Sequence, residues 1–201
     1  MTTWRDWPEL ALLEQDSHLR ERSLARQEVF RGRLLHVVRD TVAMPDGQQA
    51  TRELILHPGA VMVIPILDDG RVVVERQYRH PLGRVVVEFP AGKKDPQESS
   101  LDCARRELRE ETGLSAARWA YAGAMAPSVA YTDELIDIWL AQSLTAGETA
   151  RDEGELLDVC LSTVDGLEQM AREGELVDSK TLTGLWWLRS WRDGSWTPEW
   201  R

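Results

Sequence analysis

Residues 92–114 read Gly-Lys-Lys-Asp-Pro-Gln-Glu-Ser-Ser-Leu-Asp-Cys-Ala-Arg-Arg-Glu-Leu-Arg-Glu-Glu-Thr-Gly-Leu. Ser99 or Ser100 can cap the first turn of a helix, and Gly113 is typical of the residue that ends one. Between these signals, apolar residues recur at i, i+3 and i+7, which predicts one buried stripe. The stripe consists of Leu101, Ala104 and Leu108.

The same predicted helix carries closely spaced carboxylates. Glu107 and Glu111 are four residues apart and Glu110 is three from Glu107, so they share one face and repel one another. A hard divalent cation would offset this repulsion, and Mg²⁺ prefers carboxylate oxygens together with substrate phosphates. Arg106 can pair with a neighbouring carboxylate, and Gly92 permits a backbone turn that most side chains forbid.

An acidic helix face is often no more than a solvated surface. Here the fixed positions of Gly92, Glu98 and Gly113 around the helix favour a catalytic site over that alternative.

Composition limits the possible classes of protein. The chain has 201 residues, 42% of them hydrophobic, and a net charge of −10. Its length fits one domain, or one domain with an arm, and its negative charge argues against non-specific nucleic-acid binding. Cys103 and Cys160 form no paired motif and are predicted to be small core residues. No apolar leader or membrane-length apolar run is found, so we expect a cytoplasmic protein that does not insert into membranes.

Periodicity gives the organisation of the chain. Strand-like patterns cover residues 34–42, 50–56, 60–67, 71–78, 85–89, 119–125, 135–141 and 156–161. Helical patterns cover residues 163–173 and 179–192. Strands on both sides of a helix, followed by a final helix, favour an α/β fold with a mixed sheet packed between helices. Three tryptophans near the end, at helical spacings, are predicted to pack in the core or at a dimer face rather than to stack on a nucleotide: Trp186, Trp187 and Trp191.

With Leu108 and Leu114, the opening segment matches the Nudix box, Gly-x5-Glu-x7-Arg-Glu-U-x-Glu-Glu-x-Gly-U with U aliphatic, at every specified position. The chain therefore resembles the Nudix hydrolases. The resemblance implies a Nudix α/β/α sandwich with a mixed sheet, preceded by a small antiparallel N-terminal sheet. It also implies Mg²⁺-dependent cleavage of a nucleoside diphosphate linked to another group. We expect an N-terminal arm over residues 1–25, N-terminal strands over 26–57 and a catalytic domain over 58–201.

Motifs outside the box resemble the ADP-ribose pyrophosphatase branch, from about residue 27 to residue 190. They are Arg52-Glu53, His57-Pro58-Gly59-Ala60, Gln77-Tyr78-Arg79, Glu88-Phe89-Pro90-Ala91-Gly92, Asp133-Glu134, Asp178 and Lys180-Thr181. The chain departs from this branch at Val129, which stands where the branch usually has a proline. ADP-ribose is therefore the expected substrate, cleaved to AMP and ribose 5-phosphate, and GDP-mannose or another nucleotide sugar is the alternative.

In this branch the first strands are exchanged across a homodimer. The resemblance therefore implies that Arg52 and Glu53 lie in or beside the active site of the partner subunit. Without the resemblance, the sequence favours an alternative in which the two residues are an exposed pair on a strand surface. Arg79 is suited to phosphate oxygens because its guanidinium forms forked hydrogen bonds. Glu88 alternates with Val87 and Phe89 on a strand, so it faces away from both. The expected substrate-binding residues are Arg52, Glu53, Arg79, Glu88, Ser128, Asp133 and Glu134.

Two or three Mg²⁺ ions, with Mn²⁺ as the alternative, are expected at the box. The expected ligands are Glu98, Glu107, Glu110, Glu111 and the carbonyl of Ala91. Arg106 completes the catalytic set. The general base is either a box glutamate or a glutamate of the later acidic loop, with Glu153 the first choice there and Glu155 the second.

Two other classes of function compete. A non-catalytic nucleotide sensor would usually lack box glutamates, and this chain has all of them. A hydrolase of nucleoside triphosphates or capped RNA would often lack the N-terminal strands, and RNA would favour a basic groove.

Overall fold

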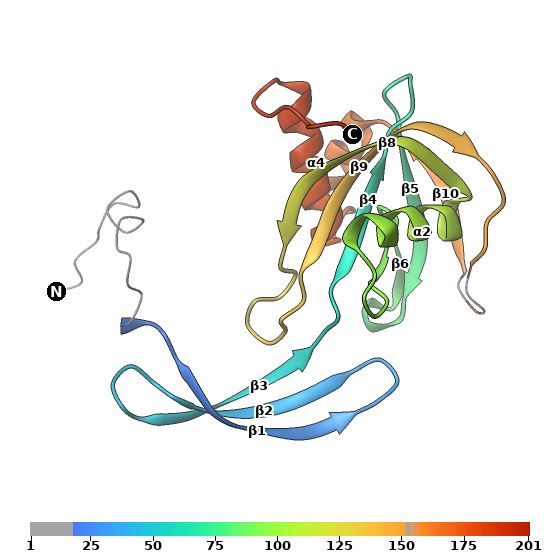
Figure 1. Ribbon diagram of the computed structural model, residues 1–201. Helices are drawn as coiled ribbons and strands as arrows, with labels where there is room; N and C mark the ends of the chain where they lie inside the picture. Colours follow the sequence, from blue (N-terminus) through green and yellow to red (C-terminus); the bar gives the residue numbers. More distant parts are fainter. Residues whose placement is uncertain (1–17, 152–153, 155) are drawn as a thin grey trace. The chain divides into compact units, whose positions relative to one another are not determined.

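The computed structural model describes residues 18–151, 154 and 156–201, which fall into two compact units (Figure 1). The first unit runs to His57 and includes Ala130–Asp133. The second comprises Pro58–Val129 and Glu134–Arg201.

The first unit is a three-stranded antiparallel sheet in the order β1-β2-β3. Its strands are β1 (Arg22–Arg31), β2 (His36–Ala43) and β3 (Gln49–Leu56). β1 begins at Arg22, so this strand extends into the segment 1–25 that was predicted to be an arm. All ten positions of β1 are exposed, which explains the missing signal: a strand without a buried face has no apolar alternation.

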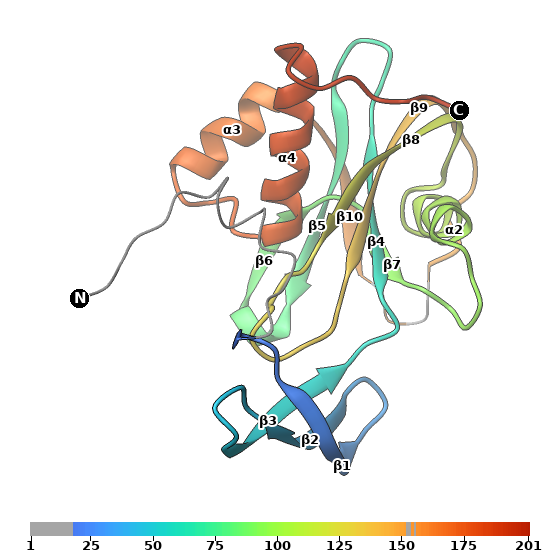
Figure 2. The same cartoon turned by 60° about the vertical axis from the view of Figure 1, so that its left-hand side comes forward.

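Within its described residues, the second unit contains two sheets and three α-helices (Figure 2). One sheet has the order β7-β4-β9-β8 and is mixed, because β4 pairs parallel with β9 and antiparallel with β7. Its strands are β4 (Ala60–Pro65), β7 (Ala91–Lys93), β8 (Leu114–Met125) and β9 (Ile136–Ala146). The other sheet has the order β10-β5-β6, with β5 (Val72–Arg79), β6 (Arg84–Glu88) and β10 (Leu157–Ser162). A short 3-10 helix, η2 (His80–Leu82), joins β5 to β6.

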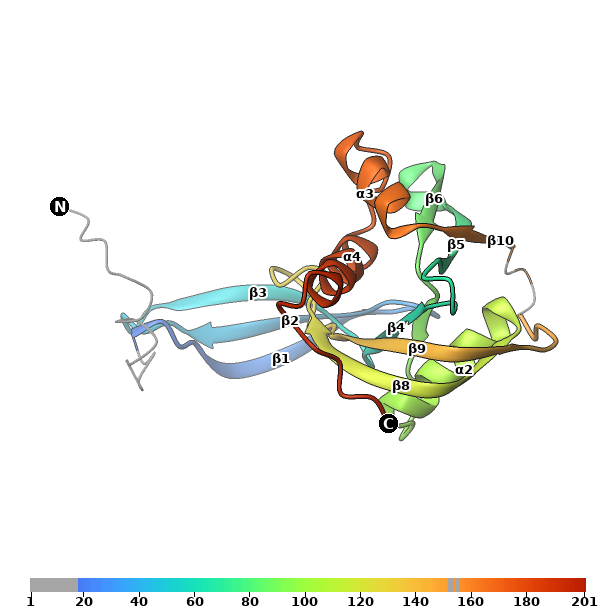
Figure 3. The same cartoon turned by 90° about the horizontal axis from the view of Figure 1, so that it is seen from above.

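Helices cover both faces of the mixed sheet (Figures 2 and 3). Helix α2 (Ser100–Thr112) lies on one side, and α3 (Val164–Arg172) and α4 (Ser179–Arg192) lie on the other. Strand β4 is buried throughout, because its side chains point alternately toward the two helical layers that cover the sheet. Met62 packs in the larger core cluster with Leu188 of α4, whereas Val61 packs in the smaller cluster with Leu108 of α2. The predicted α/β/α sandwich is therefore confirmed.

The predicted helices and strands are also found, with shifted ends. The strand predicted at 119–125 begins at Leu114, and the helices predicted at 163–173 and 179–192 are α3 and α4. Trp187 and Trp191 pack against the larger core cluster, whereas Trp186 is exposed. Among the described residues, no helix is long and apolar enough to cross a membrane.

Candidate active site on helix α2

Local sequence signals set the ends and the inner face of α2. Ser99 is the N-cap, and its hydroxyl accepts a hydrogen bond from the Asp102 N–H at 3.1 Å. Gly113 ends the helix in the left-handed region with a φ of 73°. Ala104 and Leu108 are fully buried against the sheet. Glu107 and Glu111 of the same helix are buried as well, whereas Glu110 is partly buried.

Arg106 connects three of these acidic residues. Its guanidinium donates to Glu98 at 2.9 and 2.8 Å, to Glu107 at 2.7 Å and to Glu110 at 3.0 Å. It also donates to the carbonyl of Lys93 at 3.0 Å. The hydrogen bonds from Arg106 lower the pKa of Glu98 to about 2 and raise the pKa of Arg106 itself. One guanidinium thus offsets the mutual repulsion of three carboxylates.

Position 92 requires a glycine because a side chain there would collide with Glu107, and not because the backbone turns there. Gly92 lies in β7, and it is not among the residues of positive φ, so the expected turn is wrong. A β-carbon on Gly92 would instead stand 2.0 Å from the carboxylate carbon of Glu107. A glycine is therefore the residue that allows the backbone to approach this carboxylate.

Glu111 contacts the same strand one residue earlier. Its carboxylate accepts the Ala91 N–H at 3.0 Å, and the residue is 4% exposed. Ala91 lies opposite Met62 on β4, in a position of the ladder where its N–H and C=O both point away from that strand. The backbone of Ala91 is therefore directed toward the acidic helix.

Glu88 and Arg79 form a second charged group at the end of β6. Arg79 donates to both carboxylate oxygens of Glu88, at 2.7 and 2.8 Å, and Lys180 donates to Glu88 as well. Burial raises the pKa of Glu88, but the hydrogen bonds from Arg79 and Lys180 outweigh burial and leave the pKa below its ordinary value. Glu88 is thus an ionised carboxylate in a buried place.

The expected substrate residues Arg52 and Glu53 belong to the first compact unit. Arg52 is hydrogen-bonded to Glu21, and Glu53 accepts from Arg39 at 3.1 and 2.7 Å. Both side chains are exposed within that unit. Asp133 also belongs to the first unit, and its carboxylate accepts the His57 N–H at 2.8 Å.

The loop before β9 carries the remaining expected substrate residues. Ser128 and Glu134 are partly buried, and Val129 is 83% exposed. Glu153 and Glu155 lie outside the described residues. Arg151, just before them, donates to the carbonyls of Glu111 and Leu157, both at 3.0 Å. Through its hydrogen bond to the Glu111 carbonyl, Arg151 connects the segment before the acidic loop to the end of α2.

One buried and one partly buried charged residue were missed as site residues from the sequence. Glu75 on β5 is 3% exposed and lies directly opposite Glu88 on β6. The sequence could have indicated Glu75, because it is a single charged residue directly after the apolar run Val72–Val74. Lys180 was noted only as part of a motif, and its contact with Glu88 joins residues 92 positions apart.

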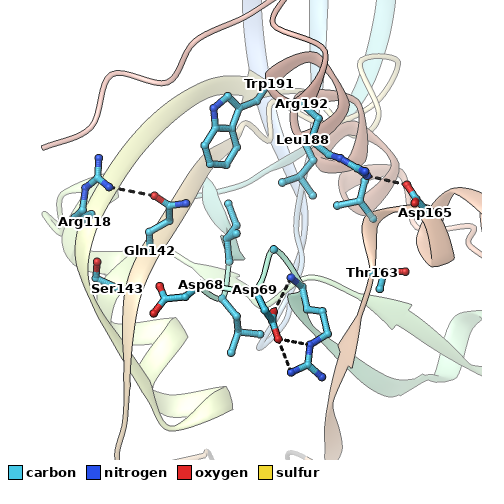
Figure 4. A pocket seen from close by; sticks show the side chains of 15 residues that line it. Asp68, Asp69, Arg118, Gln142, Ser143, Thr163, Asp165, Leu188, Trp191 and Arg192 are labelled. Carbon is cyan, nitrogen blue, oxygen red and sulfur yellow. Dashed lines mark hydrogen bonds and ion pairs between the residues drawn. The ribbon is translucent and has the colours of Figure 1, made fainter.

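A separate hollow of about 610 Å³ shares no residue with α2 (Figure 4). Arg71, Arg118 and Arg192 line it, and each is hydrogen-bonded to a neighbouring side chain, Asp69, Gln142 and Asp165 respectively. Three aspartates, Asp68, Asp69 and Asp165, also line the hollow, so its lining carries as many carboxylates as guanidinium groups.

The residues near α2 suit a hard divalent cation. All candidate ligands are carboxylate or carbonyl oxygens, and the Glu107 carboxylate occupies the space that a side chain at position 92 would fill, against the β7 backbone. Within the described residues, no three acidic, histidine or cysteine side chains already converge as a metal site. A cation at Glu107 would compete with the Arg106 guanidinium, which donates to that carboxylate at 2.7 Å.

A mixed sheet between helices, with a glutamate-rich helix facing a strand backbone, offers the oxygen ligands that a divalent-metal-dependent hydrolase of phosphate anhydrides requires. Residues 56–183 match the NUDIX domain, and residues 21–55 match the nucleoside diphosphate sugar hydrolase N-terminal domain. The chain therefore belongs to the Nudix family.

Known relatives share most of their length with this chain. It is 34% identical over 173 residues to the ADP-ribose pyrophosphatase of Bacillus subtilis (strain 168), covering 85% of this chain and 94% of the relative. It is 36% identical over 171 residues to the methanol dehydrogenase activator of Bacillus methanolicus, covering 84% and 92%. The crystal structure of an ADP compounds hydrolase superposes with a TM-score of 0.79 at 25% identity, covering 88% of this chain and 97% of that one.

Proposed function

We propose that this chain hydrolyses the pyrophosphate bond of ADP-ribose with Mg²⁺, and that the products are AMP and ribose 5-phosphate. The observation that carries the proposal is the approach of Glu107 and Glu111 to the Ala91–Gly92 backbone. The relatives named for ADP-ribose and for ADP compounds support this class of substrate.

Glu107, Glu111 and the Ala91 carbonyl would hold the cations, with Glu98 and Glu110 completing a set for two or three Mg²⁺ ions. Bound Mg²⁺ supplies Lewis acidity toward phosphate oxygens and lowers the pKa of a bound water. Arg106 holds Glu98, Glu107 and Glu110 together, so the carboxylates remain in place despite their repulsion.

The proposed substrate-binding residues start with Arg79. Arg79 is half-exposed and held in direction by Glu88, so its remaining N–H groups can donate to phosphate. Arg52, Glu53, Ser128, Asp133 and Glu134 complete the proposed binding set. The proposed general base is either a box glutamate or a glutamate of the later acidic loop, where Glu153 is the first choice and Glu155 the second. Replacing Glu153 and Glu155 by Gln separately distinguishes these two.

We further propose a homodimer in which residues 26–57 are exchanged between copies, so that Arg52 and Glu53 serve the partner's catalytic domain, residues 58–201. Strand β1 supports this proposal because it is an edge strand with apolar side chains exposed. Leu24, Val29 and Phe30 are 40%, 48% and 55% exposed. Sedimentation analysis tests this proposal, and a monomer at working concentration would contradict it.

The first experiment incubates the purified chain with ADP-ribose and Mg²⁺ and identifies the products by chromatography. We expect AMP and ribose 5-phosphate, and a loss of turnover on the order of 100-fold or more in Glu111→Gln, since metal binding supplies several kcal/mol to the transition state. The matched control is Glu175→Gln, because Glu175 is exposed and lies outside the site. Unchanged turnover in Glu111→Gln would overturn the site.

The alternative substrate is GDP-mannose or another nucleotide sugar. Val129 favours it, because this exposed residue replaces the proline that is usual in ADP-ribose pyrophosphatases. Cleavage of GDP-mannose in preference to ADP-ribose, in the same assay, would establish this alternative.

A further inference from the structure

Of the motif formed by Asp178, Lys180 and Thr181, only Lys180 has been related to the site so far, through its contact with Glu88. The motif lies at the start of α4, where Asp178 is the N-cap. The Asp178 carboxylate accepts both the N–H of Thr181, at 2.9 Å, and its hydroxyl, at 2.6 Å. A cap requires only the first of these bonds, so the second leaves the hydroxyl with a fixed direction.

The Thr181 hydroxyl oxygen in turn accepts the N–H of Phe89 at 3.0 Å. Lys180 closes the arrangement, since its ammonium contacts Asp178 at 3.0 Å and also donates to Glu88. These contacts form a ring that begins at Glu88, passes through the three residues of α4 and returns at Phe89.

The ring is shielded from water. Thr181 is 0% exposed, and the side chains of Glu88 and Lys180 are 4% and 12% exposed. Buried hydrogen bonds are costly to break, because the groups left behind lose both their partner and water. The ring is therefore a rigid connection between α4 and the end of β6.

The segment held by the ring leads directly to the acidic helix. Its four consecutive residues, 88–91, are each fixed by a different element. Arg79 of β5 holds the Glu88 carboxylate, and Thr181 of α4 holds the Phe89 N–H. The N–H of Val63 in β4 donates to the Pro90 carbonyl at 2.8 Å, and Glu111 of α2 accepts the Ala91 N–H.

We propose that Thr181, supported by Asp178 and Lys180, is a positioning residue that sets the Ala91 backbone against Glu111 for cation binding. This inference rests on the proposed function, because it assumes that the cation binds at Ala91 and Glu111. Thr181 acts through the Phe89 N–H, two residues before Ala91, and does not touch the cation or the substrate.

The test compares Thr181→Val with Thr181→Ser in the full chain. Valine keeps the shape but removes the hydroxyl, whereas serine keeps the acceptor. Thr183→Val is the matched control, since the Thr183 hydroxyl donates only to the Ser179 carbonyl of its own helix. Mn²⁺ is titrated into metal-free protein by calorimetry, without nucleotide, at a temperature where every variant is folded. Hydrogen exchange of the Phe89 and Ala91 amides is followed in the same metal-free samples.

We expect Thr181→Val to weaken Mn²⁺ binding about fivefold to tenfold, which corresponds to one net hydrogen bond, and to speed exchange at Phe89 and Ala91. Thr181→Ser and Thr183→Val should match the wild type. Wild-type Mn²⁺ affinity in Thr181→Val would overturn the inference, provided that Glu111→Gln loses the ion. If Glu111→Gln also keeps wild-type affinity, the proposed metal site itself is wrong. Failure of the wild type to cleave ADP-ribose would reject only the substrate, since the titration uses none.

Discussion

Gly92 and Glu107 approach so closely that no side chain can stand at position 92. A β-carbon there would lie 2.0 Å from both the carboxylate carbon and Oε1 of Glu107. Glu107 has little freedom to withdraw, because it is buried on α2 and hydrogen-bonded to Arg106. The position of the Glu107 carboxylate therefore explains why residue 92 of the box is a glycine.

Gly92→Ala should displace Glu107 and lower both divalent-cation affinity and turnover by on the order of 100-fold, since several kcal/mol of metal-dependent stabilisation depends on this carboxylate. Calorimetric titration of Mn²⁺ and an ADP-ribose assay measure the two effects. Gly70→Ala is the control. Gly70, unlike Gly92, has a positive φ of 85°, and it has open space around it, so this variant should lose stability while keeping the cation. Normal Mn²⁺ binding by Gly92→Ala would show that Glu107 can relocate.

Arg106→Gln should destabilise the metal-free protein more than the Mg²⁺-loaded protein. Without the guanidinium, Glu98, Glu107 and Glu110 repel one another, and a bound cation restores the missing positive charge. Thermal unfolding in the presence of a chelator and of Mg²⁺ gives the comparison. Arg105→Gln is the matched control, because Arg105 is exposed and forms only a 3.4 Å contact with Asp102. Equal destabilisation under both conditions would argue against a shared role for guanidinium and cation.

Asp40→Asn should remove stability from the first unit in a pH-dependent manner. The two hydrogen bonds from Arg26, both 2.7 Å, lower the pKa of Asp40 below its ordinary 3.8. Because the folded-state pKa is the lower one, the pair contributes stability above that ordinary value and loses it as the pH falls through the lowered pKa.

The difference in β1–β2 amide protection between wild type and Asp40→Asn should therefore be largest near neutral pH and shrink below about pH 4. Hydrogen exchange at matched pH measures it. Glu53→Gln, which disrupts the exposed Arg39–Glu53 pair, should have a smaller effect at neutral pH. A difference that stayed constant with pH would mean that the Asp40 charge is not involved.

Gly184→Ala should destabilise the fold although alanine is the better helix former. The helix preference is about 1 kcal/mol in favour of alanine, whereas overpacking a core costs about 1–3 kcal/mol. The added carbon would lie 2.8 Å from Met62 and 3.1 Å from both Ile64 and Phe89. We expect the free energy of unfolding, measured in urea, to fall by about 1 kcal/mol. An increase in the free energy of unfolding would show that Met62, Ile64 and Phe89 can move to accommodate the added methyl group.

Features local to the chain were predictable. Ser99 caps α2 and Gly113 ends it, as predicted, because capping and stop signals depend on neighbouring residues alone. The buried face of α2 follows likewise from a period of 3.6 residues. Strand β1 was only partly predicted, since its fully exposed positions carry no periodic signal.

The sequence by itself determined that α2 exists and that its glutamates and Arg106 share one surface, because positions three and four apart on a helix are neighbours whatever surrounds them. Only the tertiary structure decided what faces that surface. Pairing of β7 with β4 brings Ala91 and Gly92 to Glu111 and Glu107, and α4 brings Lys180 and Thr181 to the end of β6. These contacts join residues up to 92 positions apart, and they depend on how whole layers pack rather than on any local spacing.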